Sequence, residues 1–131
     1  DPAAERALLA GADRRDLIAQ ALPALGASQV LALREAVLGV HASYALVGYV
    51  QALLERSRHH AGVRVGLSPR AGIALLRAAR AHALLLGRGH VLPDDIQALF
   101  GAVAAHRLVA EADAGDAAAL AQAILHAVAV D

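Results

Sequence analysis

The sequence predicts an all-α fold, a small helical bundle preceded by short helices. Hydrophobic residues make up 58% of the 131 residues and aromatic residues only 2%, so Ala, Leu, Val and Ile must form the core. This composition favours helices over sheets. Apolar residues recur at helical spacing between short segments that hold Gly, Pro or capping residues, and no convincing strand pair or internal repeat is apparent.

Two short helices are expected at the start of the chain. Pro2 stands at a favoured first helical position and Gly11 at a favoured stop, which predicts a helix over Pro2–Ala10. Asp13 can cap a second helix that runs to about Leu22, before a proline. We expect residues 1–25 to be linker helices and residues 26–131 to form the bundle.

The first two bundle helices are predicted from their caps. Ser28 is the expected N-cap of a helix that ends at Gly39. Ser43 caps, or stands just inside, a helix that continues to about Arg58. We expect Tyr44 and Tyr49 of this second helix to be packing residues. The apolar sides of the two helices are Val30, Leu31, Leu33, Val37 and Leu38, and Leu46, Val47, Val50, Leu53 and Leu54.

The central helix is expected to begin at Ser68-Pro69, where a cap precedes a first-turn proline, and to run to Gly87. It is apolar almost all round, and residues 60–67 before it form a connector or one short extended stretch. Its apolar residues include Ile73, Leu75, Leu76, Ala79, Ala83, Leu84 and Leu86.

Two further helices complete the prediction. One begins at Pro93, carries Asp94 and Asp95 at its positive end and runs to about His106. A loop follows, and Asp116 is the expected cap of the last helix. Their apolar residues are Ile96, Leu99, Phe100 and Val103, and Ala121, Ile124, Leu125 and Val128.

The charges are balanced in number but not in distribution. Twelve basic residues, all Arg, face twelve acidic ones, so the net charge gives no argument for nucleic acid or membrane binding. No acid occurs between Glu55 and Asp94, which leaves a basic middle. At 100° per residue, four arginines of the central helix fall within about a quarter of its circumference. They are Arg70, Arg77, Arg80 and Arg88.

Arg70 is the strongest candidate for binding an anion. It lies in the first turn after Ser68 and Pro69, where free backbone N–H groups and the helix dipole favour negative charge. A guanidinium binds phosphate oxygens in bidentate fashion, and Arg77 is a second candidate contact. The same stripe also fits a solvated helix face or a DNA-binding module, although the chain lacks Lys, a basic excess and an evident helix-turn-helix.

The sequence argues against a catalytic site of its own. With no Cys there is no thiol nucleophile or zinc-thiolate site. His59 and His60 are adjacent and cannot share one helical face, and His82, His90, His106 and His126 lack the i, i+4 pairing or nearby carboxylates of a zinc site. No Ser lies in a nucleophile elbow. Gly87-Arg88-Gly89 lacks the Gly-Lys-Ser/Thr of a nucleotide-binding loop.

The termini and the apolar runs add two expectations. Met is absent, also at position 1, so we expect the chain to be a fragment of a longer protein. The stretch without formal charge over 36–54 is interrupted by Gly and polar residues, and we interpret it as a core helix, not a membrane span.

An ordered series of motifs resembles the C-terminal lid of MoxR-type AAA+ ATPases. The series comprises Ser68-Pro69-Arg70, Gly87-Arg88, Pro93-Asp94-Asp95 and His106-Arg107. Tyr49-Val50, Ser57-Arg58, Glu5 and Leu8-Leu9 extend the resemblance over nearly the whole chain. Two positions depart from the family pattern: Leu92 replaces a hydroxyl residue before the Pro-Asp-Asp segment, and Gly89-His90 replaces an acidic and aromatic pair.

The resemblance implies a lid that is not catalytic alone and that works in a chaperone-like ATPase. The parent would bind ATP and Mg²⁺ in a core upstream of this chain. Arg70 maps onto the family's second-sensor arginine, which reaches the terminal phosphate. The family also implies a cytoplasmic homo-hexamer and a von Willebrand factor A-type partner. A free-standing DNA-binding or protein-interaction module is the alternative to this interpretation.

Overall fold

The computed structural model describes residues 1–11 and 14–130. Contacts divide the chain into two units, one that ends at Leu31 and one that begins at Ala32. The expected assignment of residues 1–25 to a linker and 26–131 to a bundle concerns their roles and stays a prediction.

The first unit contains the two short helices. Helix α1 (Pro2–Ala10) has the predicted bounds, and the Asp1 carboxylate caps it by accepting a hydrogen bond of 2.9 Å from the Ala3 N–H. Helix α2 (Arg14–Gln20) ends before the predicted Leu22. Because Leu22 precedes a proline, a helical conformation is disfavoured there. The expected cap at Asp13 lies outside the described residues.

Helix α3 (Ala27–Gly39) corrects the predicted cap at Ser28, which lies inside the first turn. The Gly26 N–H instead donates to Oε1 of Gln29 at 2.8 Å, which is half of a capping box. No residue of α3 is buried, and the expected apolar side is largely exposed.

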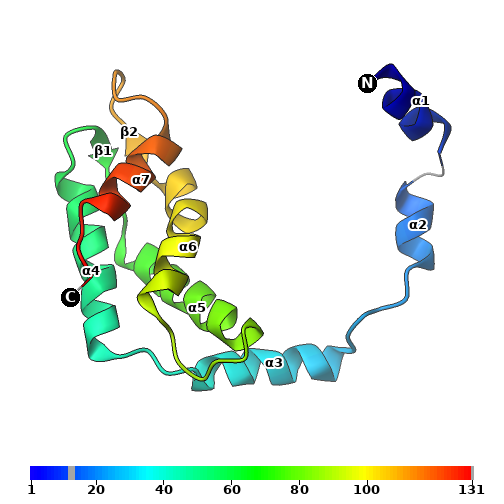
Figure 1. The fold of residues 1–131 in the computed structure, drawn as a ribbon, viewed down its shortest axis with the longest axis horizontal. Helices are drawn as coiled ribbons and strands as arrows, with labels where there is room; N and C mark the ends of the chain where they lie inside the picture. The colour runs from blue at the N-terminus through cyan, green and yellow to red at the C-terminus, as the bar shows by residue number, and fades with distance from the viewer. Residues whose placement is uncertain (12–13, 131) are drawn as a thin grey trace. The chain divides into compact units, whose positions relative to one another are not determined.

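Four helices of the second unit surround the core: α4 (Tyr44–His59), α5 (Pro69–Leu85), α6 (Pro93–Ala104) and α7 (Ala117–His126). In Figure 1, α5 and α6 lie side by side, and α7 packs on α4 and α6. A single turn of 3-10 helix, η1 (Ala105–Arg107), extends α6. The largest fully buried apolar side chains of the core are Phe100, Leu53, Leu75, Ile96 and Ile124. The all-α prediction is confirmed.

Helix α5 packs against both α4 and α6, as expected of a central helix. Its buried side consists of small and medium residues, among which Ala79 and Ala83 have no exposed surface. A Cβ on Gly72 would come within 2.8 Å of Leu54 Cδ1, so a side chain there would push α5 away from α4. The helix is not enclosed all round, because Ile73 and Leu85 are exposed.

A two-stranded antiparallel sheet corrects the expectation that no strands pair. Strand β1 (Val63–Val65) pairs with β2 (Val109–Ala110), with Val63 opposite Ala110 and an irregularity before Val65. The Glu111 N–H donates to the Gly62 carbonyl at 3.0 Å and extends the ladder. Segments this short give no alternation of apolar and polar residues that a sequence could reveal.

The structure also decides the predicted caps of α4 and α7 and the packing of the two tyrosines. Ser43 is the N-cap of α4, and its Oγ accepts from the Leu46 N–H at 3.1 Å. Tyr49 is buried in the core, whereas Tyr44 is 94% exposed, so the packing role predicted for Tyr44 is wrong. Asp116 occupies the N-cap of α7 without a side-chain capping bond. Within residues 1–11 and 14–130, every helix is too short or too polar to span a bilayer.

Candidate functional site

The start of α5 presents Arg70 on the surface. Ser68 is the N-cap, and its Oγ accepts a long hydrogen bond of 3.4 Å from the Ala71 N–H, while Pro69 occupies the first turn. Arg70 is exposed and has no hydrogen bond or ion pair with any residue that the structure describes. An unpaired guanidinium therefore lies at the positive end of a 17-residue helix.

The connector before this helix is fixed to the end of α4. The buried Ser57 hydroxyl donates to the Leu54 carbonyl at 2.6 Å and accepts from the Leu67 N–H at 2.8 Å. Arg58 Nε donates to the Leu67 carbonyl at 3.0 Å. A Cβ on Gly66 would lie 2.7 Å from the Arg58 Cα, so only glycine fits this approach. The backbone that carries Arg70 is thus held in place by contacts that the sequence did not reveal.

The other arginines of the predicted stripe differ from one another. Arg77 is exposed, like Arg70. Arg80 is half-buried, and its Nε has no hydrogen-bond partner among the described residues.

Arg88 does not belong to the stripe, which corrects the sequence prediction. Helix α5 ends at Leu85, and the chain turns at Gly87, whose φ is +73°. The Gly87 N–H donates to the Leu84 carbonyl and the Arg88 N–H to the Ala83 carbonyl, both at 2.9 Å. This pair of bonds is a Schellman motif, which directs the chain away from the helix axis.

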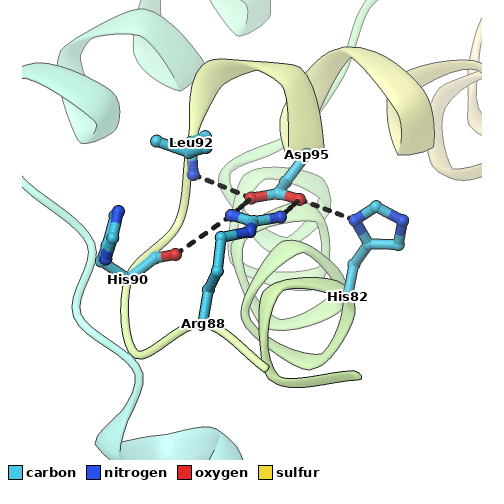
Figure 2. A network of polar contacts seen from close by, with 5 residues as sticks. All are labelled: His82, Arg88, His90, Leu92 and Asp95. Atoms are coloured by element: carbon cyan, nitrogen blue, oxygen red, sulfur yellow. Dashed lines mark hydrogen bonds and ion pairs between the residues drawn. The ribbon is translucent and has the colours of Figure 1, made fainter. Parts of the chain in front are cut away.

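Arg88 instead binds Asp95 in the network of Figure 2. Arg88 Nη1 and Nη2 donate to the two carboxylate oxygens of Asp95 at 2.7 and 2.6 Å. The Leu92 N–H donates to Asp95 Oδ2 at 2.8 Å, and His82 Nδ1 lies 2.7 Å from Oδ1. Arg88 Nη1 also contacts the His90 carbonyl at 3.3 Å.

The Asp95 carboxylate is the buried hub of this network, with 1% of its surface exposed. The hydrogen bonds from Arg88, followed by those from Leu92 and His82, lower the pKa of Asp95 well below its ordinary value, although burial opposes the shift. The same contact raises the pKa of Arg88. We name this network the Arg88–Asp95 clamp; it connects the end of α5 to the start of α6.

The clamp decides two points that the sequence raised, the cap at Leu92 and the surroundings of His82. Leu92, which replaces a hydroxyl residue of the family pattern, gives α6 no side-chain cap, and Asp95 supplies only the other half of a capping box by accepting from the Leu92 N–H. The expectation that His82 has no nearby carboxylate is wrong, because the fold brings Asp95 to it. The described residues nevertheless contain no group of three or more His, Asp or Glu that could hold a metal ion.

Comparison with known proteins connects this geometry to a family. The AAA lid domain family matches residues 55–127, which is more than half of the chain. "Uncharacterized protein YeaC" of Bacillus subtilis is 36% identical over 70% of this chain and 29% of its own length. "Chaperone MoxR1" of Mycobacterium tuberculosis is 34% identical over 72% of the chain and 28% of its own length. "Protein MoxR" of Paracoccus denitrificans is 43% identical over 53% and 24%.

A solved structure agrees with these matches. The crystal structure of a candidate ATPase from Cytophaga hutchinsonii has a TM-score of 0.76 and 27% identity, over 79% of this chain and 36% of that protein. The chain thus spans less than a third of the length of the curated relatives it matches. The resemblance to the MoxR lid is confirmed, and the chain belongs to the AAA lid domain family.

Proposed function

We propose that this lid supplies Arg70 to the terminal phosphate of ATP, bound by an AAA+ core of the same parent protein, as a second-sensor arginine. The observation that carries the proposal is the exposed guanidinium of Arg70, which has no partner among the described residues and lies in the first turn of α5. Both the side chain and the helix end favour a phosphate. Arg77, also exposed, is a weaker second contact.

The chain fits one part of an ATP site and not the rest. Arg70 has the charge and the geometry to bind a phosphate. Because the described residues form no cluster of metal ligands, Mg²⁺ would be bound by the core. Bound ATP would supply the phosphoanhydride whose hydrolysis drives remodelling. This chain would bind and sense the nucleotide, and would not catalyse hydrolysis alone.

The same contacts support a mechanical role for the lid. The hydrogen bonds of Ser57 and Arg58 fix the start of α5 to α4, and the Arg88–Asp95 clamp fixes its end to α6. When hydrolysis releases the phosphate contact of Arg70, α4, α5 and α6 would therefore move together relative to the core. The hexamer, the von Willebrand factor A-type partner and the cytoplasmic location stay expectations from the family resemblance.

The experiment compares ATP turnover by the parent protein with Arg70→Ala, Arg70→Lys and the control Arg56→Ala. Arg56 is also exposed and lies on α4. We expect Arg70→Ala to lower kcat about ten-fold or more, the scale of losing one charged donor to a transferring phosphoryl group. Arg70→Lys should restore part of the rate, and Arg56→Ala should have no effect. Wild-type kcat in Arg70→Ala would refute the sensor assignment.

A further inference from the structure

Helix α4 contacts the chain on both sides of Arg70, at two points. Before Arg70 the backbone of Leu67 is hydrogen-bonded to the end of α4, and after it Gly72 packs on α4. Arg70 itself has no hydrogen bond or ion pair with any residue that the structure describes. Within the described chain, the position of its guanidinium therefore depends on the backbone between these two points.

The first contact point uses both polar backbone groups of Leu67. Its N–H donates to Ser57 Oγ at 2.8 Å, and its carbonyl accepts from Arg58 Nε at 3.0 Å. The Ser57 hydroxyl donates its own hydrogen to the Leu54 carbonyl at 2.6 Å, so its oxygen is oriented to accept. Because Ser57 has no exposed surface and Leu67 is 3% exposed, water would not readily replace the bond to the Leu67 N–H.

The second contact point is steric. A Cβ on Gly72 would lie 2.8 Å from Cδ1 of Leu54 and 3.5 Å from Cγ1 of Val50, so the backbone of α5 rests directly on α4 at this residue. Leu54 takes part in both contact points, because its carbonyl accepts from Ser57 and its side chain meets Gly72. Helix α4 thus supports the first turn of α5 from both ends.

The side-chain cap of α5 is too long to set this geometry alone. Ser68 Oγ accepts from the Ala71 N–H at 3.4 Å, whereas such hydrogen bonds are usually about 2.7–3.2 Å long. At the start of α4 the equivalent bond to Ser43 is 3.1 Å long. Because a weak cap leaves a helix end prone to fraying, the contacts with α4 must hold the turn that carries Arg70.

We propose that Ser57 and Arg58 are positioning residues, which hold Arg70 at the distance and angle that a terminal phosphate requires. This inference rests on the proposed sensor role of Arg70. Each residue acts through the peptide groups of Leu67, three residues before Arg70, and neither needs to touch the nucleotide. Because a displacement of about 1 Å can lower turnover about 100-fold, losing either bond should lower kcat even in a folded lid. The alternative is that the two bonds contribute stability alone.

The test is a double-mutant cycle on ATP turnover by the parent protein, at a temperature at which circular dichroism shows every variant to be folded. We expect Ser57→Ala and Arg58→Ala each to lower kcat about five-fold or more. In the Arg70→Ala background the same substitutions should change kcat less than about two-fold, because the contact that they position is absent. Equal losses in the two backgrounds would overturn the proposal.

Ser43→Ala and Arg56→Ala are the matched controls. Ser43→Ala removes one serine hydroxyl bond at the opposite end of α4, so Tm should fall while kcat stays within about two-fold. Arg56→Ala removes another exposed arginine of α4 and should leave kcat unchanged. If Ser43→Ala lowers kcat as much as Ser57→Ala does, turnover follows stability and the positioning role is overturned.

Arg70→Ala alone separates this inference from the function on which it rests. Wild-type kcat in Arg70→Ala would refute the sensor assignment, and the positioning role with it. A loss of kcat in Arg70→Ala, together with wild-type kcat in Ser57→Ala and Arg58→Ala, would overturn the positioning role and leave the sensor assignment standing.

Hydrogen exchange in the 131-residue chain gives a readout that needs no nucleotide. The Leu67 amide should exchange at least about ten-fold faster in Ser57→Ala than in the wild type, because it loses its acceptor. The Leu46 amide, which Ser43 caps, should change less than about three-fold. Equal exchange rates of the Leu67 amide in the two chains would mean that Ser57 does not hold this segment, and would overturn the proposal.

Discussion

Replacing Asp95 by Asn should destabilise the second unit, because it removes the charge at the centre of the Arg88–Asp95 clamp. Asp95 is 1% exposed. Its carboxylate accepts two hydrogen bonds from the Arg88 guanidinium and one from the Leu92 N–H, and it lies 2.7 Å from His82 Nδ1. The Asn amide group keeps the shape but offers one acceptor oxygen, so its NH₂ must face a donor.

The expected loss in the free energy of unfolding follows from these contacts. Hydrogen bonds to a charged group contribute about 1.5–3 kcal/mol each, and breaking a fully buried ion pair costs about 3–5 kcal/mol. The Arg88 side chain retains 24% exposure and keeps part of its hydration, so we expect a cost at or just below the lower limit of the ion-pair range, about 2–3 kcal/mol. For a unit of this size, that loss corresponds to a fall in Tm on the order of 10 °C.

Thermal unfolding of the 131-residue chain measures this effect. The control is Asp94→Asn, since Asp94 is an exposed acid in the same first turn of α6. It should cost at most about 0.5 kcal/mol through the helix dipole. If Asp95→Asn changes Tm no more than Asp94→Asn does, the clamp contributes no stability and the reasoning is refuted.

Two further predictions concern pH and the close approach at Gly66. Because the pKa of Asp95 is lowered from its ordinary value of 3.8, the stability that its carboxylate contributes is fully present above about pH 4. That stability is lost as the pH falls toward the pKa of Asp95 in the folded state. The free energy of unfolding, measured as a function of pH, should therefore fall more steeply below about pH 4 in the wild type than in Asp95→Asn. Equal slopes in the two proteins would contradict the lowered pKa of Asp95. Gly66→Ala should cost about 1–3 kcal/mol, because its Cβ would lie 2.7 Å from the Arg58 Cα. The control is Gly101→Ala inside α6, where an added Cβ would have no neighbouring atom within 4 Å. This variant should stabilise the chain by about 0.5–1 kcal/mol. Denaturant unfolding measures the free energy of unfolding of both variants, and equal effects would contradict the steric argument.

Local signals predicted most helices of the second unit. Ser43 and Ser68 cap α4 and α5 as expected, and Pro69 and Pro93 stand at the predicted first positions. These signals act within one turn of helix, so the sequence alone reveals them. Ser28 was a wrong cap because Gly26 and Gln29, two neighbours with weaker signals, satisfy the end of α3.

The features that sequence reasoning missed depend on turns and on distant partners. Helical spacing placed Arg88 on the stripe, but Gly87 ends the helical geometry one residue earlier. Asp95 was assigned to the helix dipole, and nothing in the spacing shows that a turn brings Arg88 to it. The position of Arg70 in a capped first turn could be predicted because its signal is local, and its role as a phosphate contact stays a proposal.

The most direct test of the account measures two properties of Arg70→Ala: ATP turnover by the parent protein and Tm of the 131-residue chain. Because Arg70 is exposed and has no partner among the described residues, the account predicts an unchanged Tm, within about 1 °C. It predicts that turnover falls about ten-fold or more. Wild-type turnover, or a loss of turnover that parallels a loss of folding, would contradict the role of Arg70 as the phosphate sensor.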